Sequence, residues 1–428
     1  MYKIFLLLFV SIFFISCATT HENKLTPNEK AFDEEDTYIM FALRAEQVKS
    51  YQTAAKLFAQ LYDKSQKKEY LYRSVQNRYL AKDYNTTIEI INRYLEYEPN
   101  DRKLQRYKIG SLAESGNISE AISLALLLSK QTQQPDDYIL TADVYIKNRQ
   151  YEEALQYLES AYAKEYNEKI LDKIAIILYV NLSRKKDAIA ELETHSRMHG
   201  CSELICNRLI GIYSNENDID GLLSVYKRKY SLDKESEVAK KIIQIYGYTR
   251  DYVKLMNFLE ESGEDEELLL QLYLSAKDFK KAYLLASKLY KKENSLEYLG
   301  QSAIYEYEAN KADLNKKVLK SVVSKLTKVV ANKNDTLYKN YLGYILIDHE
   351  IDIKKGMKYI REVLKVKPKS GYYLDSLAWG YYKLGQCKKA KKLMLKVKTL
   401  EGGDDPEVDL HMKKINECLK KQILKRKK

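Results

Sequence analysis

The chain has 428 residues, with 72 Lys and Arg against 60 Asp and Glu and a formal net charge of +12. It contains 15 Gly and 5 Pro, together under 5% of the residues, where an average protein has about 12%. This scarcity excludes an all-β sandwich or barrel, which needs Gly- or Pro-rich turns at short intervals. A hydrophobic fraction of 45% with 38 Tyr is enough to bury a core, so the bulk of the chain is not disordered.

The first sixteen residues predict an export signal. Residues 1–16 read MYKIFLLLFVSIFFIS, in which Lys3 precedes an unbroken apolar run from Ile4 to Ile15. Twelve residues span only about 18 Å as a helix, short of the roughly 30 Å of a bilayer core. A positive charge ahead of such a short run is typical of a secretory signal peptide. No other apolar run approaches the length of a membrane span, so we expect none elsewhere.

The end of this signal reads Phe14-Ile15-Ser16-Cys17 and resembles the lipobox of bacterial lipoproteins, although Phe14 stands where that family usually has Leu. The resemblance implies cleavage before Cys17, a diacylglycerol on its thiol and an acylated amine, which together form a stable membrane anchor. Ala18 in place of Asp resembles the outer-membrane default. We therefore expect anchoring on the periplasmic face of the outer membrane, with the inner membrane left open. The alternative is an ordinary signal peptide with a coincidental cysteine.

One short sequence motif, called here the repeat word, recurs along the chain. It consists of an aromatic or aliphatic residue, two polar residues, a small residue, and an apolar residue four positions further on. Its copies begin at Tyr51, Tyr84, Ile118, Tyr151, Lys185, Ile219 and Tyr252, in steps of 33 or 34 residues. Period and word resemble the tetratricopeptide repeat, a helix–turn–helix unit of 34 residues. We therefore expect an all-α fold, a right-handed superhelical solenoid of about 10–12 stacked antiparallel helix pairs, some of them degenerate.

The clearest unit is residues 135–168. Ala142 and Ala154 hold the small positions, where they let two antiparallel helices approach closely, and Tyr145 and Leu158 fill the space between units. A long coiled coil would need sustained heptads, which the 33- and 34-residue steps do not supply.

The repeat register divides the chain into segments. It slips after residue 260, where the word at Phe279 follows Tyr252 by only 27 residues. We expect a signal peptide at 1–16, the lipidated cysteine and a tether at 17–35, a regular array at 36–260, degenerate repeats at 261–335, C-terminal units at 336–404 and a capping helix with a basic tail at 405–428.

Three further sequence motifs, called here the C-terminal words, lie in the last quarter of the chain and are more distinctive than the repeat word. Asn340–Tyr344 reads NYLGY, Leu374–Trp379 reads LDSLAW, and a DPE sequence at 405–407 is followed by His411. This run resembles the C-terminal repeats of bacterial envelope tetratricopeptide proteins, which carry NxLGY, LDSxGW and DPE…H. Ala378 replaces the usual Gly, and Met412 stands where that family has Leu. The resemblance implies a fold and a compartment but no chemistry.

A groove for a partner is expected on the first helices of the pairs, which face the concave side in such repeats. In the last full unit the residues predicted to be exposed there are Tyr372, Asp375, Trp379 and Tyr382. Aromatic side chains with a few charges make good anchors for a docked segment. The alternative places Trp379 in the core.

Residues capable of chemistry are sparse, and the sequence contains no phosphate loop, HExxH or GxSxG motif. The one cluster to consider is His195, His199, Cys201 and Cys206, where a soft metal or zinc is conceivable. The two cysteines are five residues apart rather than two to four, and no carboxylate obvious from the sequence orients either imidazole. We therefore expect structural residues there, with no metal, no cofactor and no catalytic residue.

Four cysteines remain after Cys17, and in an exported protein they permit disulfides. We expect one between Cys387 and Cys418, because the start of one helix lies beside the end of its antiparallel neighbour. Two reduced thiols are the alternative. Cys201 and Cys206 are poorer candidates, since five residues of helix separate their Cα atoms by about 7.5 Å, and only a loop would let them close.

Lysines gather at the C-terminus, where attraction to anionic lipid or lipopolysaccharide is one interpretation and a solvated helix face the other. Nucleic acid is not expected for an exported protein. Taken together, the sequence predicts a membrane-anchored scaffold for protein or peptide partners in the bacterial envelope, without catalysis. The alternative is an envelope enzyme or a dedicated accessory subunit of a peptidoglycan, polysaccharide or secretion machine.

Overall fold

The computed structural model describes residues 30–427, with side chains up to residue 424. The predicted signal at 1–16 and Cys17 lie outside the described residues. Within them every regular element is a helix, and α1 to α22 form eleven consecutive pairs followed by α23. This confirms the predicted all-α solenoid of helix pairs. No helix between residues 30 and 427 has both the length and the apolar content that crossing a bilayer requires.

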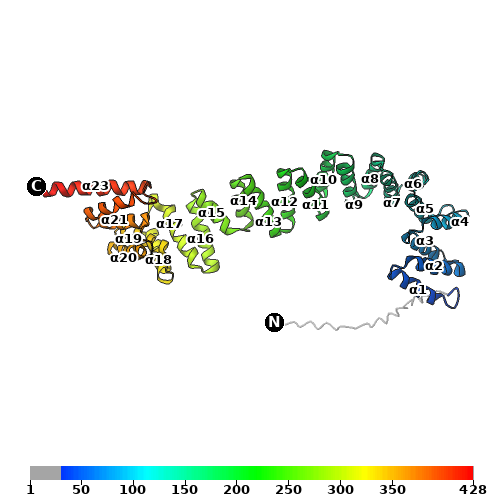
Figure 1. The fold of residues 1–428 in the computed structure, drawn as a ribbon, viewed down its shortest axis with the longest axis horizontal. Coiled ribbons are helices and arrows are strands. Elements are labelled where there is room, and N and C mark those ends of the chain that lie inside the picture. The colour runs from blue at the N-terminus through cyan, green and yellow to red at the C-terminus, as the bar shows by residue number, and fades with distance from the viewer. Residues whose placement is uncertain (1–29, 428) are drawn as a thin grey trace, which may run out of the picture. The chain divides into compact units, whose positions relative to one another are not determined.

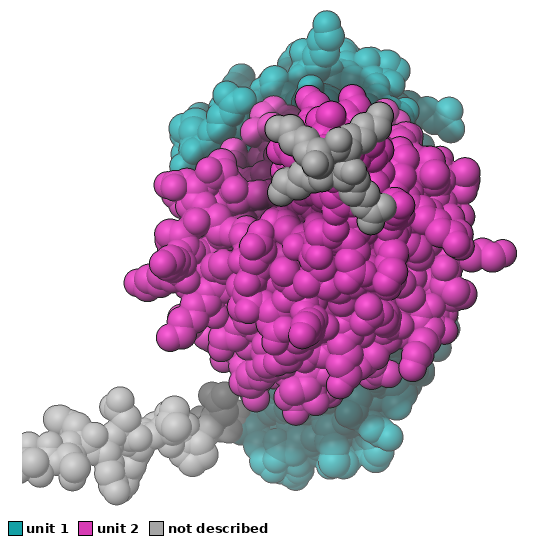
Figure 2. Space-filling model, turned by 90° about the vertical axis from the view of Figure 1, so that its left-hand side faces the viewer, with its two compact units in different colours: residues 1–229 teal, residues 230–428 magenta. Residues whose placement is uncertain are grey.

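The chain divides into two compact units, residues 1–229 and 230–428 (Figure 2). Consecutive helices of each unit lie side by side along the chain (Figure 1). The helices that begin in the first unit are α1 (Glu35–Gln47), α2 (Tyr51–Ser65), α3 (Lys68–Leu80), α4 (Tyr84–Leu95), α5 (Arg102–Ser115), α6 (Ile118–Thr132), α7 (Pro135–Lys147), α8 (Tyr151–Glu165), α9 (Glu168–Ile176) with a π-helical extension (Ile177–Asn181), α10 (Lys185–His199), α11 (Glu203–Asn215) and α12 (Ile219–Asp233).

The second unit contains α13 (Ser236–Thr249), α14 (Tyr252–Ser262), α15 (Glu266–Ser275), α16 (Phe279–Glu293), α17 (Leu296–Asn310), a 3₁₀ turn (Lys311–Asp313), α18 (Lys316–Asn332), α19 (Thr336–Asp348), α20 (Ile353–Val366), α21 (Gly371–Lys383), α22 (Cys387–Val397) and α23 (Pro406–Lys427). The register slip has a simple origin here. Helices α14 and α15 have 11 and 10 residues, where α12 has 15, so the step from Tyr252 to Phe279 is short. The segment limits at 260 and 335 remain predictions about repeat regularity.

The recurring word marks the second helix of each pair. All seven copies begin at the first residue of a helix, from α2 to α14. In the first five copies the small residue, fourth in its helix, is fully buried: Ala54, Thr87, Ala121, Ala154 and Ala188. Two positions before each of the seven helices the backbone is left-handed, with φ between 53° and 92°: Lys49, Lys82, Gly116, Arg149, Ser183, Asn217 and Arg250. The repeat length therefore results from two helices of set length joined through one left-handed residue.

Tyrosine hydroxyls join neighbouring pairs through carboxylates. Tyr70 on α3 donates to Glu35 on α1 at 2.6 Å, and Tyr338 on α19 donates to Glu297 on α17 at 2.6 Å. In each case the ring fills the space between helices while the hydroxyl is satisfied at its end. Among residues 30–424 no buried tyrosine hydroxyl lacks a hydrogen-bond partner.

Candidate functional site

A pocket of about 460 Å³ lies in the second unit, on the first helices of the last three pairs. Its walls come from α17, α19 and α21, and the start of α23 closes one side. Tyrosines form much of the wall, among them Tyr307, Tyr341 and Tyr372. Four helices far apart in the sequence thus contribute to one concave site.

The three C-terminal words meet at this pocket. Asn340 and Tyr344 come from the first word, Asp375 from the second and Glu407 from the third, and all four line the pocket. The hydroxyl of Tyr344 donates to Oε1 of Glu407 at 2.5 Å. His411 of the third word holds Asp375 through its Nδ1 atom, at 2.9 and 3.0 Å from the two carboxylate oxygens. The three C-terminal words, which lie in different repeats, therefore form one site together.

Burial dominates the electrostatics of the pocket. It raises the pKa of Tyr344 above its usual range, and the hydrogen bond to Glu407 adds to this. Burial also raises the pKa of Tyr341 to about 12 and raises that of the Glu308 carboxyl. Nζ of Lys311 lies 4.0 Å from carboxylate oxygens of both Glu308 and Glu407, and its charge lowers the pKa of Glu308 in part. Tyr341 and Tyr344 therefore stay neutral at neutral pH and present both an apolar ring and a hydroxyl to the pocket.

One polar atom of the pocket has no partner. Oδ1 of Asn340 is buried, and it accepts no hydrogen bond from the described residues. Buried polar groups are nearly always satisfied, so this acceptor is an exception on a residue of the pocket wall. At the rim, Tyr372 is 56% exposed. The pocket wall thus combines Asn340, which has an unsatisfied acceptor, with the exposed aromatic ring of Tyr372.

The structure separates the four residues of the predicted groove. Tyr372 and Asp375 line the pocket, but Trp379 and Tyr382 do not. Asp375 and Trp379 are only 7% and 2% exposed, so the prediction that they are exposed is wrong, and Trp379 lies in the core. The reason is that α23 folds back over α21, which puts the ring of His411 against that of Trp379 at 3.9 Å between centroids.

Trp379 is held on two further sides. Its ring stacks on Tyr382 at 4.5 Å, and its Nε1 donates to Oδ1 of Asp348 at 2.8 Å. A tryptophan with both faces covered and its N–H satisfied is a packing residue. Trp379 therefore packs α21 against α23 and Asp348 of α19.

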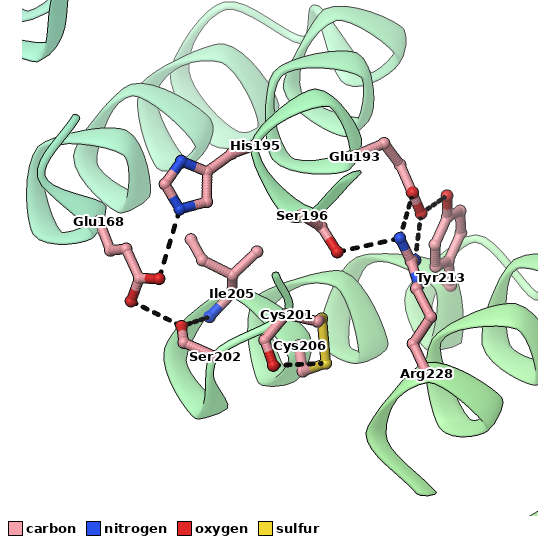
Figure 3. Close-up of a disulfide and its surroundings, with 10 residues drawn as sticks. All are labelled: Glu168, Glu193, His195, Ser196, Cys201, Ser202, Ile205, Cys206, Tyr213 and Arg228. Carbon is pink, nitrogen blue, oxygen red and sulfur yellow. Dashed lines mark hydrogen bonds and ion pairs between the residues drawn. A yellow bond between two sulfur atoms is a disulfide. The ribbon is translucent and has the colours of Figure 1, made fainter. Parts of the chain in front are cut away.

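The cluster around His195 belongs to the first unit (Figure 3). His195 is buried, with the hydroxyl of Tyr162 2.6 Å from its Nδ1 and Oε1 of Glu168 3.3 Å from its Nε2. Glu168 also accepts a hydrogen bond from Ser202 at 2.6 Å. The sequence did not reveal this carboxylate, because Glu168 begins a different helix, α9. Among the described residues no group of three or more His, Cys, Asp or Glu side chains is arranged to hold a metal ion.

Both cysteine pairs are joined in the structure. Cys387 at the start of α22 is linked to Cys418 on α23, with Cα atoms 6.1 Å apart. Cys201 is linked to Cys206, with Cα atoms 5.3 Å apart (Figure 3). The second link is possible because Cys201 precedes α11, whose N-cap is the extended residue Ser202, so the two cysteines are not on one continuous helix.

No protein-family model matches the chain, and no curated protein matches it. Among solved structures, it is similar to the APC/C hetero-tetramer Cut9–Hcn1, with 10% identity, a TM-score of 0.36 and coverage of 90% of this chain and 97% of that one. It is also similar to yeast Tom70, with 12% identity, a TM-score of 0.32 and coverage of 92% and 97%.

A structure of Naa15/Naa10 bound to HypK-THB is similar at 14% identity with a TM-score of 0.34, over 79% of this chain and 64% of that one, so this chain spans less than two thirds of that protein. All of these similarities concern the fold alone.

Proposed function

We propose that the protein is a lipid-anchored interaction scaffold of the bacterial cell envelope, and that the pocket on α17, α19, α21 and α23 receives a segment of a partner protein. The observation that carries the pocket is the orphaned Oδ1 of Asn340 among tyrosine walls. A peptide backbone presents N–H groups at regular spacing, so it can supply the missing donor while its side chains lie against the aromatic rings. The lipobox at Cys17 supports the anchor.

The pocket is tested by photo-crosslinking in cells. The photo-reactive residue p-benzoylphenylalanine replaces Tyr372 at the rim, and in the control it replaces Tyr248 on α13, which is 78% exposed and outside the pocket. We expect a discrete protein adduct from position 372 that is absent from position 248. Identical adducts from the two positions, or none from position 372, would contradict a partner in this pocket.

Asn340→Ala separates a binding role from a structural one. Removing a buried acceptor that has no partner costs little stability and can even raise it. We therefore expect the variant to keep its melting temperature but to lose the adduct at position 372. A variant that unfolds, or one that keeps the adduct, would show that Asn340 does not bind the partner.

The anchor is tested separately. Cys17→Ser should leave an uncleaved precursor or a soluble periplasmic form that no longer incorporates a palmitate analogue. Partitioning into detergent and labelling as in the wild type would refute the anchor at Cys17.

The enzyme alternative has less to support it. Three carboxyl groups line the pocket. Asp375 is engaged by His411 and Glu407 by Tyr344, and both contacts hold α23 in place, whereas general acid–base catalysis needs groups that reach a substrate. The third, Glu308, lies 4.0 Å from Nζ of Lys311 and has no second free carboxyl group beside it in the pocket lining to act as its acid–base partner.

A further inference from the structure

Most of the net charge lies in the last tenth of the chain. Residues 387–428 contain 14 Lys and Arg against 6 Asp and Glu, a net charge of +8 out of the total of +12. Of the 14 basic residues 13 are Lys, and the segment contains no Phe, Trp or Tyr. This composition is unlike the rest of the chain, which is rich in tyrosine and nearly balanced in charge.

The structure puts these lysines on the outer faces of the last two helices. Helix α22 turns Cys387, Ala390, Met394 and Val397 inward, and α23 does the same with Val408, His411 and Ile415. Six exposed lysines on the opposite faces have no ion-pair partner among the described residues: Lys388, Lys392, Lys396, Lys413, Lys420 and Lys421. We call these six the basic surface. Since none of the six is held in an ion pair within the described part of the chain, their ammonium groups can attract an external anion.

The last turns of α23 continue past the body of the unit. Cys418 is linked to Cys387, the first residue of α22, and Gln422 donates to the carbonyl of Gly385 at 2.7 Å. Beyond that contact Ile423 and Leu424 are 53% and 64% exposed. Two large apolar side chains are therefore exposed to solvent beside exposed lysines. The helix that carries them is attached to α22 by the disulfide.

We infer that the basic surface and the exposed pair Ile423 and Leu424 bind the surface of an anionic lipid bilayer, with the lysines on lipid phosphates and the apolar pair among the acyl chains. Clusters of lysine near a membrane attract acidic lipid, and aliphatic side chains beside them enter the interface. This inference does not depend on a partner in the pocket.

The composition distinguishes a bilayer from a nucleic acid. Proteins that bind single strands stack bases on aromatic rings and use arginine as a planar donor. This segment has no aromatic residue and a single arginine, Arg426, whereas it exposes Leu395 and Leu410 between its lysines in addition to the pair at its end. Lysine interleaved with aliphatic residues fits a lipid surface.

The test uses vesicle flotation of the full mature chain with Cys17→Ser, so that no acyl chain contributes. The probes are vesicles of equal parts phosphatidylglycerol and phosphatidylcholine, and vesicles of phosphatidylcholine alone. We expect binding to the anionic vesicles only, and its loss in high salt. Each lysine near such a surface contributes about fivefold, so Lys413→Gln, Lys420→Gln and Lys421→Gln together should weaken binding by about 100-fold.

A matched control keeps the result specific. Lys316, Lys317 and Lys320 on α18 are likewise exposed and lie outside residues 387–428. Replacing these three by Gln removes the same charge and should leave vesicle binding within about twofold. Ile423→Ser with Leu424→Ser should weaken binding to anionic vesicles by about tenfold or more, since two apolar side chains no longer leave water.

Three outcomes would overturn the inference. The first is no binding to anionic vesicles at low salt. The second is an equal loss in the α18 control, which would mean that net charge alone acts. The third is tighter binding to heparin or single-stranded DNA than to anionic vesicles at equal charge concentration, which would assign the surface to a soluble polyanion.

Discussion

Breaking the link between Cys387 and Cys418 should loosen the end of the second unit selectively. The two residues are 31 positions apart, and the link joins the start of α22 to the later turns of α23. In the chain-entropy model, closing a loop of that size stabilises by about 3.7 kcal/mol at 25 °C. The five-residue separation of Cys201 and Cys206 gives only about 2 kcal/mol by the same relation.

The effect should be local because a solenoid is stabilised by contacts between neighbours, and α23 has a helix on one side only. Buried side chains of α23, Val408, His411 and Ile415, keep it attached without the link, but it then opens more often. Native-state hydrogen exchange measures this opening helix by helix. On reduction of the wild-type protein we expect amide exchange in α23 to accelerate by up to about 500-fold, the equivalent of 3.7 kcal/mol.

Two variants make the comparison specific. Cys201→Ala with Cys206→Ala keeps only the C-terminal link, so reduction should still accelerate exchange in α23. Cys387→Ala with Cys418→Ala should show fast exchange in α23 before any reductant is added. The reasoning fails if Cys387 and Cys418 are alkylated in the non-reduced protein, or if reduction leaves exchange in α23 unchanged.

Three further perturbations each change a single contact. Burial raises the pKa of Glu35, but hydrogen bonds from Lys67, Tyr70 and the amide of Ala31 outweigh it and lower this pKa to about 2. Glu35 therefore stabilises the fold above pH 4.5 by up to about 3 kcal/mol, and this contribution is lost as the pH falls toward 2. The unfolding free energies of wild type and Glu35→Gln, measured by urea titration at several pH values, should converge at low pH, and parallel curves would contradict this. Trp379→Ala should cost about 3–5 kcal/mol in the second unit and leave Asp348 without its donor, and a fully stable variant in thermal melts would refute a core role. Arg149→Gly should raise stability by about 0.5–1 kcal/mol, because Arg149 has φ of 59°; a fall in the denaturant midpoint would show that the turn tolerates arginine without strain.

The helix pairs could be predicted because the repeat depends on side-chain volume. A fully buried Ala154 or Ala188 is needed wherever two helices approach closely, so the small residue recurs in the sequence at the structural period. The turns could not be recognised in the same way. At their left-handed position Gly116 is the expected residue, but Lys49 and Arg149 adopt the same conformation, and their identity gives no hint of it.

The site was only half predictable, because it is made by contacts between elements that are far apart in the chain. Tyr372 could be placed at its edge from helical spacing alone. The burial of Trp379 could not, since it depends on α23 folding back so that His411 covers the ring. Similarly, Glu168 contacts His195 from another helix, and neither the residue types nor their spacing in the sequence predicts this pair.

Helix α23 connects the two proposed binding sites, the pocket and the membrane-binding surface. Its first turn supplies Glu407 to the wall of the pocket, and its last turns carry Ile423 and Leu424. A single helix of 22 residues, about 33 Å long, therefore joins the two. A ligand that holds one end of this helix against the body reduces the cost of ordering the other end. A partner segment in the pocket and lipid at Ile423 and Leu424 would consequently raise each other's affinity by the same factor. The protein would then bind most tightly where the partner and the membrane are both present.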